Sequence, residues 1–155
     1  MDTKLFSDTV PKGHGIDDST SKNPVGCYTF EPKSSVPVRV IALDNTADEN
    51  SKFLDAAKRG DPFVNGGFAF LDKTRFEWLS NQLAKVSKDG KLVIISAHIP
   101  LGVNLWSSTS EISEEQVIGK VQEYSNVALV TAGHRHLNTV TAFKSPNPAK
   151  PELGF

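Results

Sequence analysis

Two short apolar runs, residues 92–97 and 127–132, constrain the fold of this chain more than any other feature. Both are rich in β-branched residues and are too short for buried helices, so each predicts a buried strand. Between them, residues 113–116 read Ser-Glu-Glu-Gln, a capping box that predicts a helix over 114–124. A strand, a helix and a strand in this order form a βαβ unit with parallel strands. The chain is therefore expected to belong to the α/β class.

Other segments predict further elements around this unit. Residues 26–31 and 38–43 predict two strands joined by a short turn. Asp72 is a plausible N-cap for a helix that continues to Asp89 and Gly90, with apolar residues at helical spacing. One helical turn is expected at 51–58, and the alternation in 138–143 predicts a last strand. We expect an extended arm or loop over 1–25, the domain over 26–144 and a loose tail over 145–155.

Three of the four histidines follow the two apolar runs. His98 follows the first run, while His134 and His136 follow the second, directly after Gly133. Parallel strands end at the same edge of a sheet, and neighbouring strands lie about 4.8 Å apart. Neutral imidazole is the commonest transition-metal ligand in proteins, so the pattern predicts a metal site at this edge. A lone histidine at a strand end is usually a polar surface group, but three of four in this setting favour a site.

The spacing of the last two histidines adds a further expectation. In an extended backbone, residues two apart point the same way, so His134 and His136 should share a face from which Arg135 points away. One histidine would then face one ion and the second a neighbouring ion. Two ions roughly 3.5–4 Å apart form a clamp for in-line displacement at phosphorus.

Composition excludes several other classes. The 155 residues suit one domain or part of one, and the net charge of −1 provides no basic field for nucleic acid. The single cysteine, Cys27, permits no internal disulfide, and we expect it to be a small buried hydrophobe. No apolar run approaches the roughly 20 residues needed to span a membrane. The opening residues lack the apolar core of a signal peptide, but a leader could lie upstream, so the compartment is left open.

Two segments resemble the last motifs of the calcineurin-like metallophosphoesterases. Residues 96–100 read Ser-Ala-His-Ile-Pro, and residues 133–136 read Gly-His-Arg-His. The helix with Phe-Glu-Trp-Leu at 76–79 also resembles a helix of this family, and the similarity covers roughly 26–143. The arm and residues 26–44 suggest a bacterial branch. The resemblance implies a four-layer α-β-β-α sandwich, mixed sheets with flanking helices, and hydrolysis of phosphomono- or phosphodiesters with two divalent ions (Mn, Fe or Zn).

The resemblance also assigns roles. His98 and His134 would bind one metal ion and His136 the other. The family's Asp-x-His, Gly-Asp-x-x-Asp and Gly-Asn-His-Asp/Glu motifs do not occur in this chain. We therefore expect the carboxyl-terminal half of such a hydrolase, as a truncated product or a piece of a longer one. Alone it should be inactive as a phosphatase. Its partners would be the missing amino-terminal half and a phosphate-ester substrate.

The sequence leaves open what covers the apolar face of the sheet and which of three functions the chain has. An apolar sheet face left without its partner layer would drive formation of a homo-oligomer or be covered by the arm. One alternative function is a complete single-metal module with three histidine ligands, and another is a non-catalytic interaction domain. A reading frame that encodes Asp-x-His and Gly-Asn-His upstream of Met1 would favour the hydrolase.

Other candidate residues carry weaker signals. His14, between two glycines, could contact phosphate or donate a proton, although a solvated loop histidine is more common. Trp106 lies in the loop after His98 and could flank a substrate or act as a packing anchor. Asp44 ends the strand 38–43 and is expected to be a turn residue.

Overall fold

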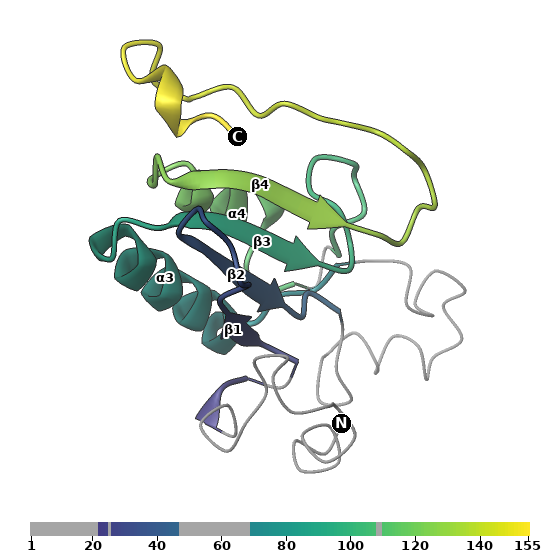
Figure 1. Ribbon diagram of the computed structural model, residues 1–155. Helices are drawn as coiled ribbons and strands as arrows, with labels where there is room; N and C mark the ends of the chain where they lie inside the picture. The colour runs from purple at the N-terminus through teal and green to yellow at the C-terminus, as the bar shows by residue number, and fades with distance from the viewer. Residues whose placement is uncertain (1–21, 25, 47–68, 108–109) are drawn as a thin grey trace, which may run out of the picture.

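The computed structural model describes residues 22–24, 26–46, 69–107 and 110–155, which form a four-stranded sheet flanked by two helices (Figure 1). The strand order is β1-β2-β3-β4, with β1 antiparallel to β2 and the other pairs parallel. This arrangement confirms the expected α/β class and the mixed sheet. The strands are β1 (Tyr28–Phe30), β2 (Val38–Leu43), β3 (Leu92–Ala97) and β4 (Val127–Ala132).

The longer helix, α3, spans Lys73–Lys88 and begins as predicted. The Asp72 side chain accepts a hydrogen bond from the Arg75 amide at 2.7 Å, which satisfies one of the free N–H groups of the first turn. Asp89 caps the other end, where two lysines in the last turn favour the negative end of the helix dipole.

The shorter helix, α4, spans Glu114–Val121 and opens with the predicted capping box between Ser113 and Gln116. It ends before residue 124, because the amides of Glu123 and Tyr124 bond to carbonyls three residues back rather than four. No described helix is both long and apolar enough to cross a membrane.

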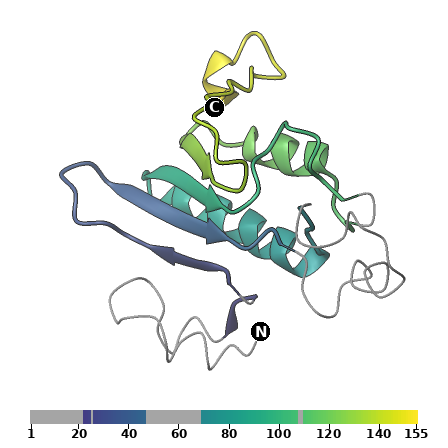
Figure 2. The ribbon, with the colours of Figure 1, turned by 90° about the vertical axis from the view of Figure 1, so that its right-hand side faces the viewer.

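Both helices cover the same face of the sheet (Figures 1 and 2). Burying one large aliphatic side chain contributes roughly 1.5–3 kcal/mol relative to leaving it in water, so this layer supplies most of the apolar stabilisation. The core here joins strand residues Ile41, Leu43, Val93, Ile95 and Val127 to helix residues Leu79, Leu83, Val86, Val117 and Val121.

The opposite face of the sheet is apolar but only partly covered. Val40, on β2, and Ile94, on β3, are half-buried there, although β3 is a central strand. Leu92 is 41% exposed and Leu129 48% exposed. No element of the described part of the chain packs as a layer against this face (Figure 2).

The segment after β4 does not form the expected last strand, so that prediction was wrong. Within the described residues nothing pairs with the outer edge of β4, and Val140 is 98% exposed. Instead Phe143 and Phe155 exchange two backbone hydrogen bonds and stack at 4.8 Å between ring centroids. The Phe143 ring also lies against Gly102, which has φ +74°. These contacts fix Phe143 in a segment that makes no strand pairing with β4.

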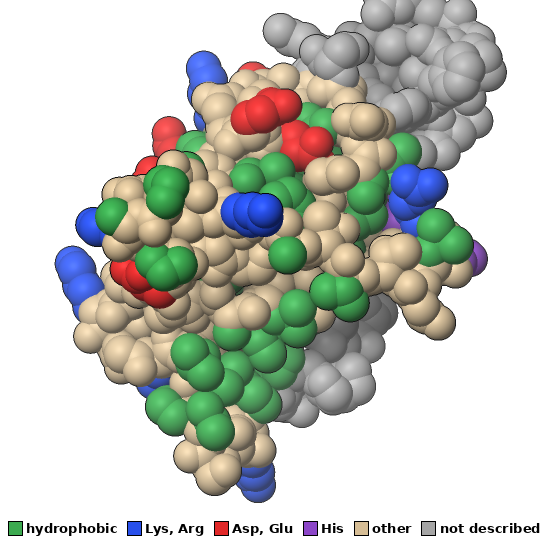
Figure 3. Space-filling view, turned by 90° about the horizontal axis from the view of Figure 1, so that it is seen from above, with side chains coloured by type: hydrophobic (Ala, Val, Ile, Leu, Met, Phe, Trp, Pro, Cys, Tyr) green, Lys and Arg blue, Asp and Glu red, His purple; other side chains and the backbone are tan. Residues whose placement is uncertain are grey.

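The carboxyl-terminal tail ends in a short 3-10 helix, η2 (Pro151–Leu153). Figure 3 looks down on β4 and this tail, and hydrophobic side chains gather on that surface with histidine at its right-hand margin. The exposed hydrophobic residues of this region include Leu129 and Leu137. The expected arm, except for a few residues near position 24, and the helical turn at 51–58 lie outside the described residues.

Candidate metal centre at the carboxyl edge of the sheet

Two of the predicted ligands meet at the carboxyl edge of the parallel strands. Nδ1 of His134 lies 3.2 Å from Nε2 of His98, and the rings meet edge-on at 81° with centroids 5.0 Å apart. The Gly133 amide donates to the His98 carbonyl at 3.1 Å, which continues the β3–β4 pairing beyond the strand ends. Thus the βαβ unit brings together two histidines that are 36 residues apart in the sequence.

The third predicted ligand, His136, is exposed and does not join this pair. His134 and His136 both adopt left-handed backbone conformations, with φ of +66° and +52°. The Arg135 amide donates to the Gly133 carbonyl at 2.8 Å in a tight turn. The extended geometry expected for this segment was therefore wrong, because the turn reorients the second histidine. Among the described residues, no group of three or more His, Cys, Asp or Glu side chains could hold a metal ion.

Asn45 fixes the backbone beside His98, a role that sequence reasoning missed. It lies just after β2 and is fully buried. Its side-chain oxygen accepts hydrogen bonds from the amides of His98 and Ile99, both at 3.1 Å. Its side-chain nitrogen donates to the Ile99 carbonyl at 2.7 Å. One amide therefore ties the end of β2 to the residue that carries the first imidazole.

Asp44 and the buried Arg75 hold the turn that contains Asn45. One Asp44 oxygen accepts from the amide and the hydroxyl of Thr46, at 2.9 and 2.6 Å, which confirms the predicted turn role. The Arg75 guanidinium donates to the Thr46 carbonyl at 2.8 Å and lies 3.7 Å from the second Asp44 oxygen. A helix residue thus anchors the end of β2 by charge and hydrogen bonding.

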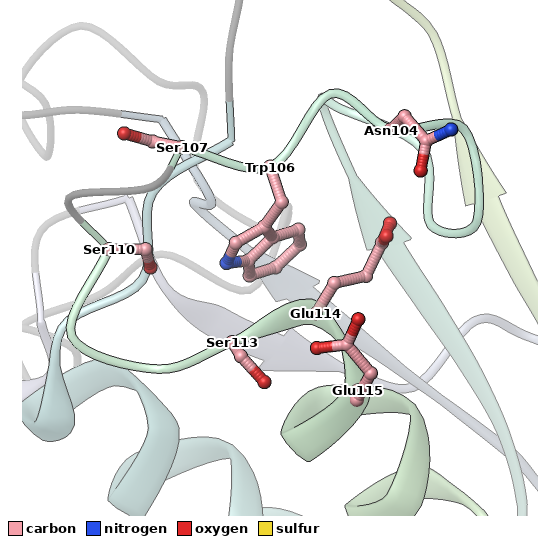
Figure 4. A pocket seen from close by; sticks show the side chains of 7 residues that line it. All are labelled: Asn104, Trp106, Ser107, Ser110, Ser113, Glu114 and Glu115. Atoms are coloured by element: carbon pink, nitrogen blue, oxygen red, sulfur yellow. The ribbon is translucent and has the colours of Figure 1, made fainter.

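Trp106 is a packing anchor, one of the two roles considered for it. Its indole N–H donates to the Ile112 carbonyl at 2.7 Å, and the half-buried ring packs against the core. It also lines a cavity of about 350 Å³ in the loop between β3 and α4 (Figure 4). Substrate contact by Trp106 stays a prediction.

Two other predicted residues have different outcomes. Cys27 is buried as expected, and burial raises the pKa of its thiol to about 12. Such a thiol stays protonated and unreactive near neutral pH. His14, predicted to contact substrate, lies outside the described residues.

Comparison with known proteins leaves the family open. No protein-family model matches the chain. No curated protein matches it either.

Proposed function

We propose that this chain is the carboxyl-terminal part of a dinuclear metal-dependent phosphoesterase that hydrolyses phosphomono- or phosphodiesters. The observation that carries the proposal is the approach of the His98 and His134 imidazoles to 3.2 Å at the ends of two parallel strands. These two residues would hold one divalent ion, and His136 would hold the second. The remaining ligands would come from the missing half of the domain.

The spacing of the two imidazoles suits a shared metal ion. An ion bound to both nitrogens forms a triangle with them. Its two metal–nitrogen sides are about 2.1 Å long and its third side is the 3.2 Å separation of the nitrogens. The N–metal–N angle in this triangle is about 100°. This value lies between the angles of octahedral and tetrahedral coordination, about 90° and 109°. The donor set of neutral imidazoles fits Mn, Fe or Zn.

The chain's own residues would orient and position the site. Asn45 fixes the backbone of His98, and the Gly133 amide fixes the distance between β3 and β4 at the same point. His98 and His134 would hold a divalent ion at this edge, and such an ion would supply Lewis-acid chemistry toward a phosphate ester. For His136 to hold the second ion, the turn at residues 133–136 would have to change so that its ring faces the same edge.

The half-open face of the sheet also supports the proposal. In a four-layer α-β-β-α sandwich, this face would pack against a second sheet, while α3 and α4 would form one outer layer. Side chains such as Val40, Ile94 and Leu129 form an apolar surface that is suited to such a layer. Aligned sheets pack about 10 Å apart through side chains of this kind. A homo-oligomer that buries the same face remains a competing prediction.

Hydrolysis by the chain and by the product of its complete reading frame tests the function. We expect the chain alone to hydrolyse an aryl phosphate poorly with added Mn²⁺, because it has no bridging carboxylate or general acid from the absent motifs. The longer product should be active, and His134→Ala should abolish that activity, whereas the exposed Asn81→Ala on α3 should not.

Two results would contradict this proposal. Turnover by the chain alone in the ordinary enzyme range of about 1–10³ s⁻¹, lost in His134→Ala, would refute the half-enzyme interpretation. A complete reading frame without Asp-x-His and Gly-Asn-His would instead favour a three-histidine module or a non-catalytic interaction domain.

A further inference from the structure

The cavity that Trp106 lines lies in the loop between β3 and α4 and does not include the histidine pair. The cavity measures about 350 Å³, in the size range of small-molecule sites. Figure 4 shows the Trp106 indole between Ser110 on one side and two glutamates on the other. The lining residues are Asn104, Trp106, Ser107, Ser110, Ser113, Glu114 and Glu115.

The Trp106 ring forms a fixed aromatic wall of this cavity. Its N–H is bound to the Ile112 carbonyl at 2.7 Å, and its backbone forms an isolated bridge with Ala69. The Ser110 hydroxyl also donates to the Ile112 carbonyl, at 2.7 Å. With its only donor satisfied by the protein, the indole can offer a ligand its π-face but no hydrogen bond.

The two glutamates make the opposite wall anionic. Glu114 accepts a hydrogen bond from the Gly102 amide at 2.6 Å. A hydrogen bond from the Ser113 hydroxyl lowers the pKa of Glu115, which keeps that carboxylate ionised near neutral pH. In the part of the chain that the structure describes, neither carboxylate has an ion-pair partner, and no Lys, Arg or His lines the cavity. The amino end of α4 offsets only about half a charge.

We propose that this cavity binds a small organic cation, an alkylated ammonium group packed on the Trp106 ring and facing Glu114 and Glu115. A cation over an indole face is attracted by the ring quadrupole, and the carboxylates add direct charge attraction. A phosphate or other anion would be repelled by the same two charges. A neutral polyol would find hydrogen-bond acceptors here, but it would gain nothing from the unpaired charge.

Titration of the full chain with choline and with its neutral isostere 3,3-dimethyl-1-butanol tests the proposal. The two probes have nearly the same shape and differ in charge, so their difference isolates the electrostatic contribution. We expect choline to shift the indole N–H resonance of Trp106 and to bind roughly tenfold more tightly than the isostere. Binding should weaken as salt is raised, because the carboxylates lie near solvent.

Variants separate the cavity from the rest of the surface. Trp106→Leu, and separately the double change Glu114→Gln with Glu115→Gln, should each weaken choline binding about tenfold, while Trp106→Phe should retain part of it because a ring remains. Glu123→Gln removes one carboxylate charge just beyond the other end of α4, where Glu123 pairs with Lys120 outside the cavity, and should leave binding unchanged.

The proposal is overturned by several outcomes. Equal binding of choline and its isostere would show that charge is not recognised. Tighter binding of glucose than of choline would identify a polyol site instead. Choline binding that is lost equally in Glu123→Gln, or no binding at millimolar choline, would refute a specific cation site.

Discussion

Replacing Asn45 with alanine should destabilise the fold through one well-defined set of contacts. The substitution removes the hydrogen bonds to the His98 amide, the Ile99 amide and the Ile99 carbonyl. Ile99 is 0% exposed, so water cannot replace its two lost partners. His98 is exposed, so the larger cost falls on the two backbone groups of the buried Ile99.

The magnitude follows from the two backbone groups left without partners. A buried donor or acceptor without a partner costs about 1–3 kcal/mol, so two such groups at Ile99 cost roughly 2–6 kcal/mol in unfolding free energy. For a chain of this size each kcal/mol lowers the melting temperature by about 2–4 °C. A loss near 3 kcal/mol therefore lowers it by about 6–12 °C.

Denaturant unfolding and thermal melting of Asn45→Ala measure this loss directly. Asn81→Ala is the matched control, because Asn81 is exposed on α3 and its change should stay within about 0.5 kcal/mol. Hydrogen exchange at the Ile99 amide should accelerate in Asn45→Ala alone. If Asn45→Ala loses less than about 1 kcal/mol, the buried amide does not hold this edge of the sheet.

Three further predictions concern other parts of the fold. Gly102→Ala should destabilise the chain by about 1–3 kcal/mol, measured by denaturant unfolding. An added Cβ would lie 2.7 Å from the Phe143 ring, and the backbone at Gly102 is left-handed. Unchanged stability would contradict this contact. Cys27, with its pKa raised by burial, should react with a thiol reagent at pH 8 only after unfolding, and rapid reaction of the native chain would show that it is accessible. Hydrogen bonds from Lys91 and Arg39 lower the pKa of Glu31 to about 2, so its stabilising effect should be complete above about pH 4.5 and lost as pH falls towards 2. In Glu31→Gln the melting temperature should depend less on pH over that range. An unchanged pH dependence in the variant would show that Glu31 does not cause the loss of stability in acid.

The sequence was sufficient for the elements whose signals are local. The capping box at Ser113 and the N-cap at Asp72 depend on hydrogen bonds within four residues, so both helix starts were predictable. The parallel βαβ geometry was then enough to predict that His98 and His134 lie at one edge, and the structure of the intervening loop was not needed.

The remaining features depend on tertiary context. Asn45 has ordinary turn chemistry in the sequence, and nothing local indicates that its side chain reaches a strand end 53 residues away. The left-handed conformations of His134 and His136 are uncommon for residues other than glycine, so the sequence did not predict them. The neighbouring Gly133 was the residue expected to allow the turn. The alternation in 138–143 predicts a strand but does not specify a partner edge, and contacts of Phe143 with Gly102 and Phe155 prevailed.

Calorimetric titration with Zn²⁺ tests the central claim that His98 and His134 bind one metal ion. We predict weak binding to the chain, because neutral imidazoles without a carboxylate provide no anionic charge for a divalent cation. His98→Ala and His134→Ala should each abolish the binding heat, while Asn81→Ala should retain it. Unchanged Zn²⁺ affinity in both histidine variants would contradict the assignment of the metal centre.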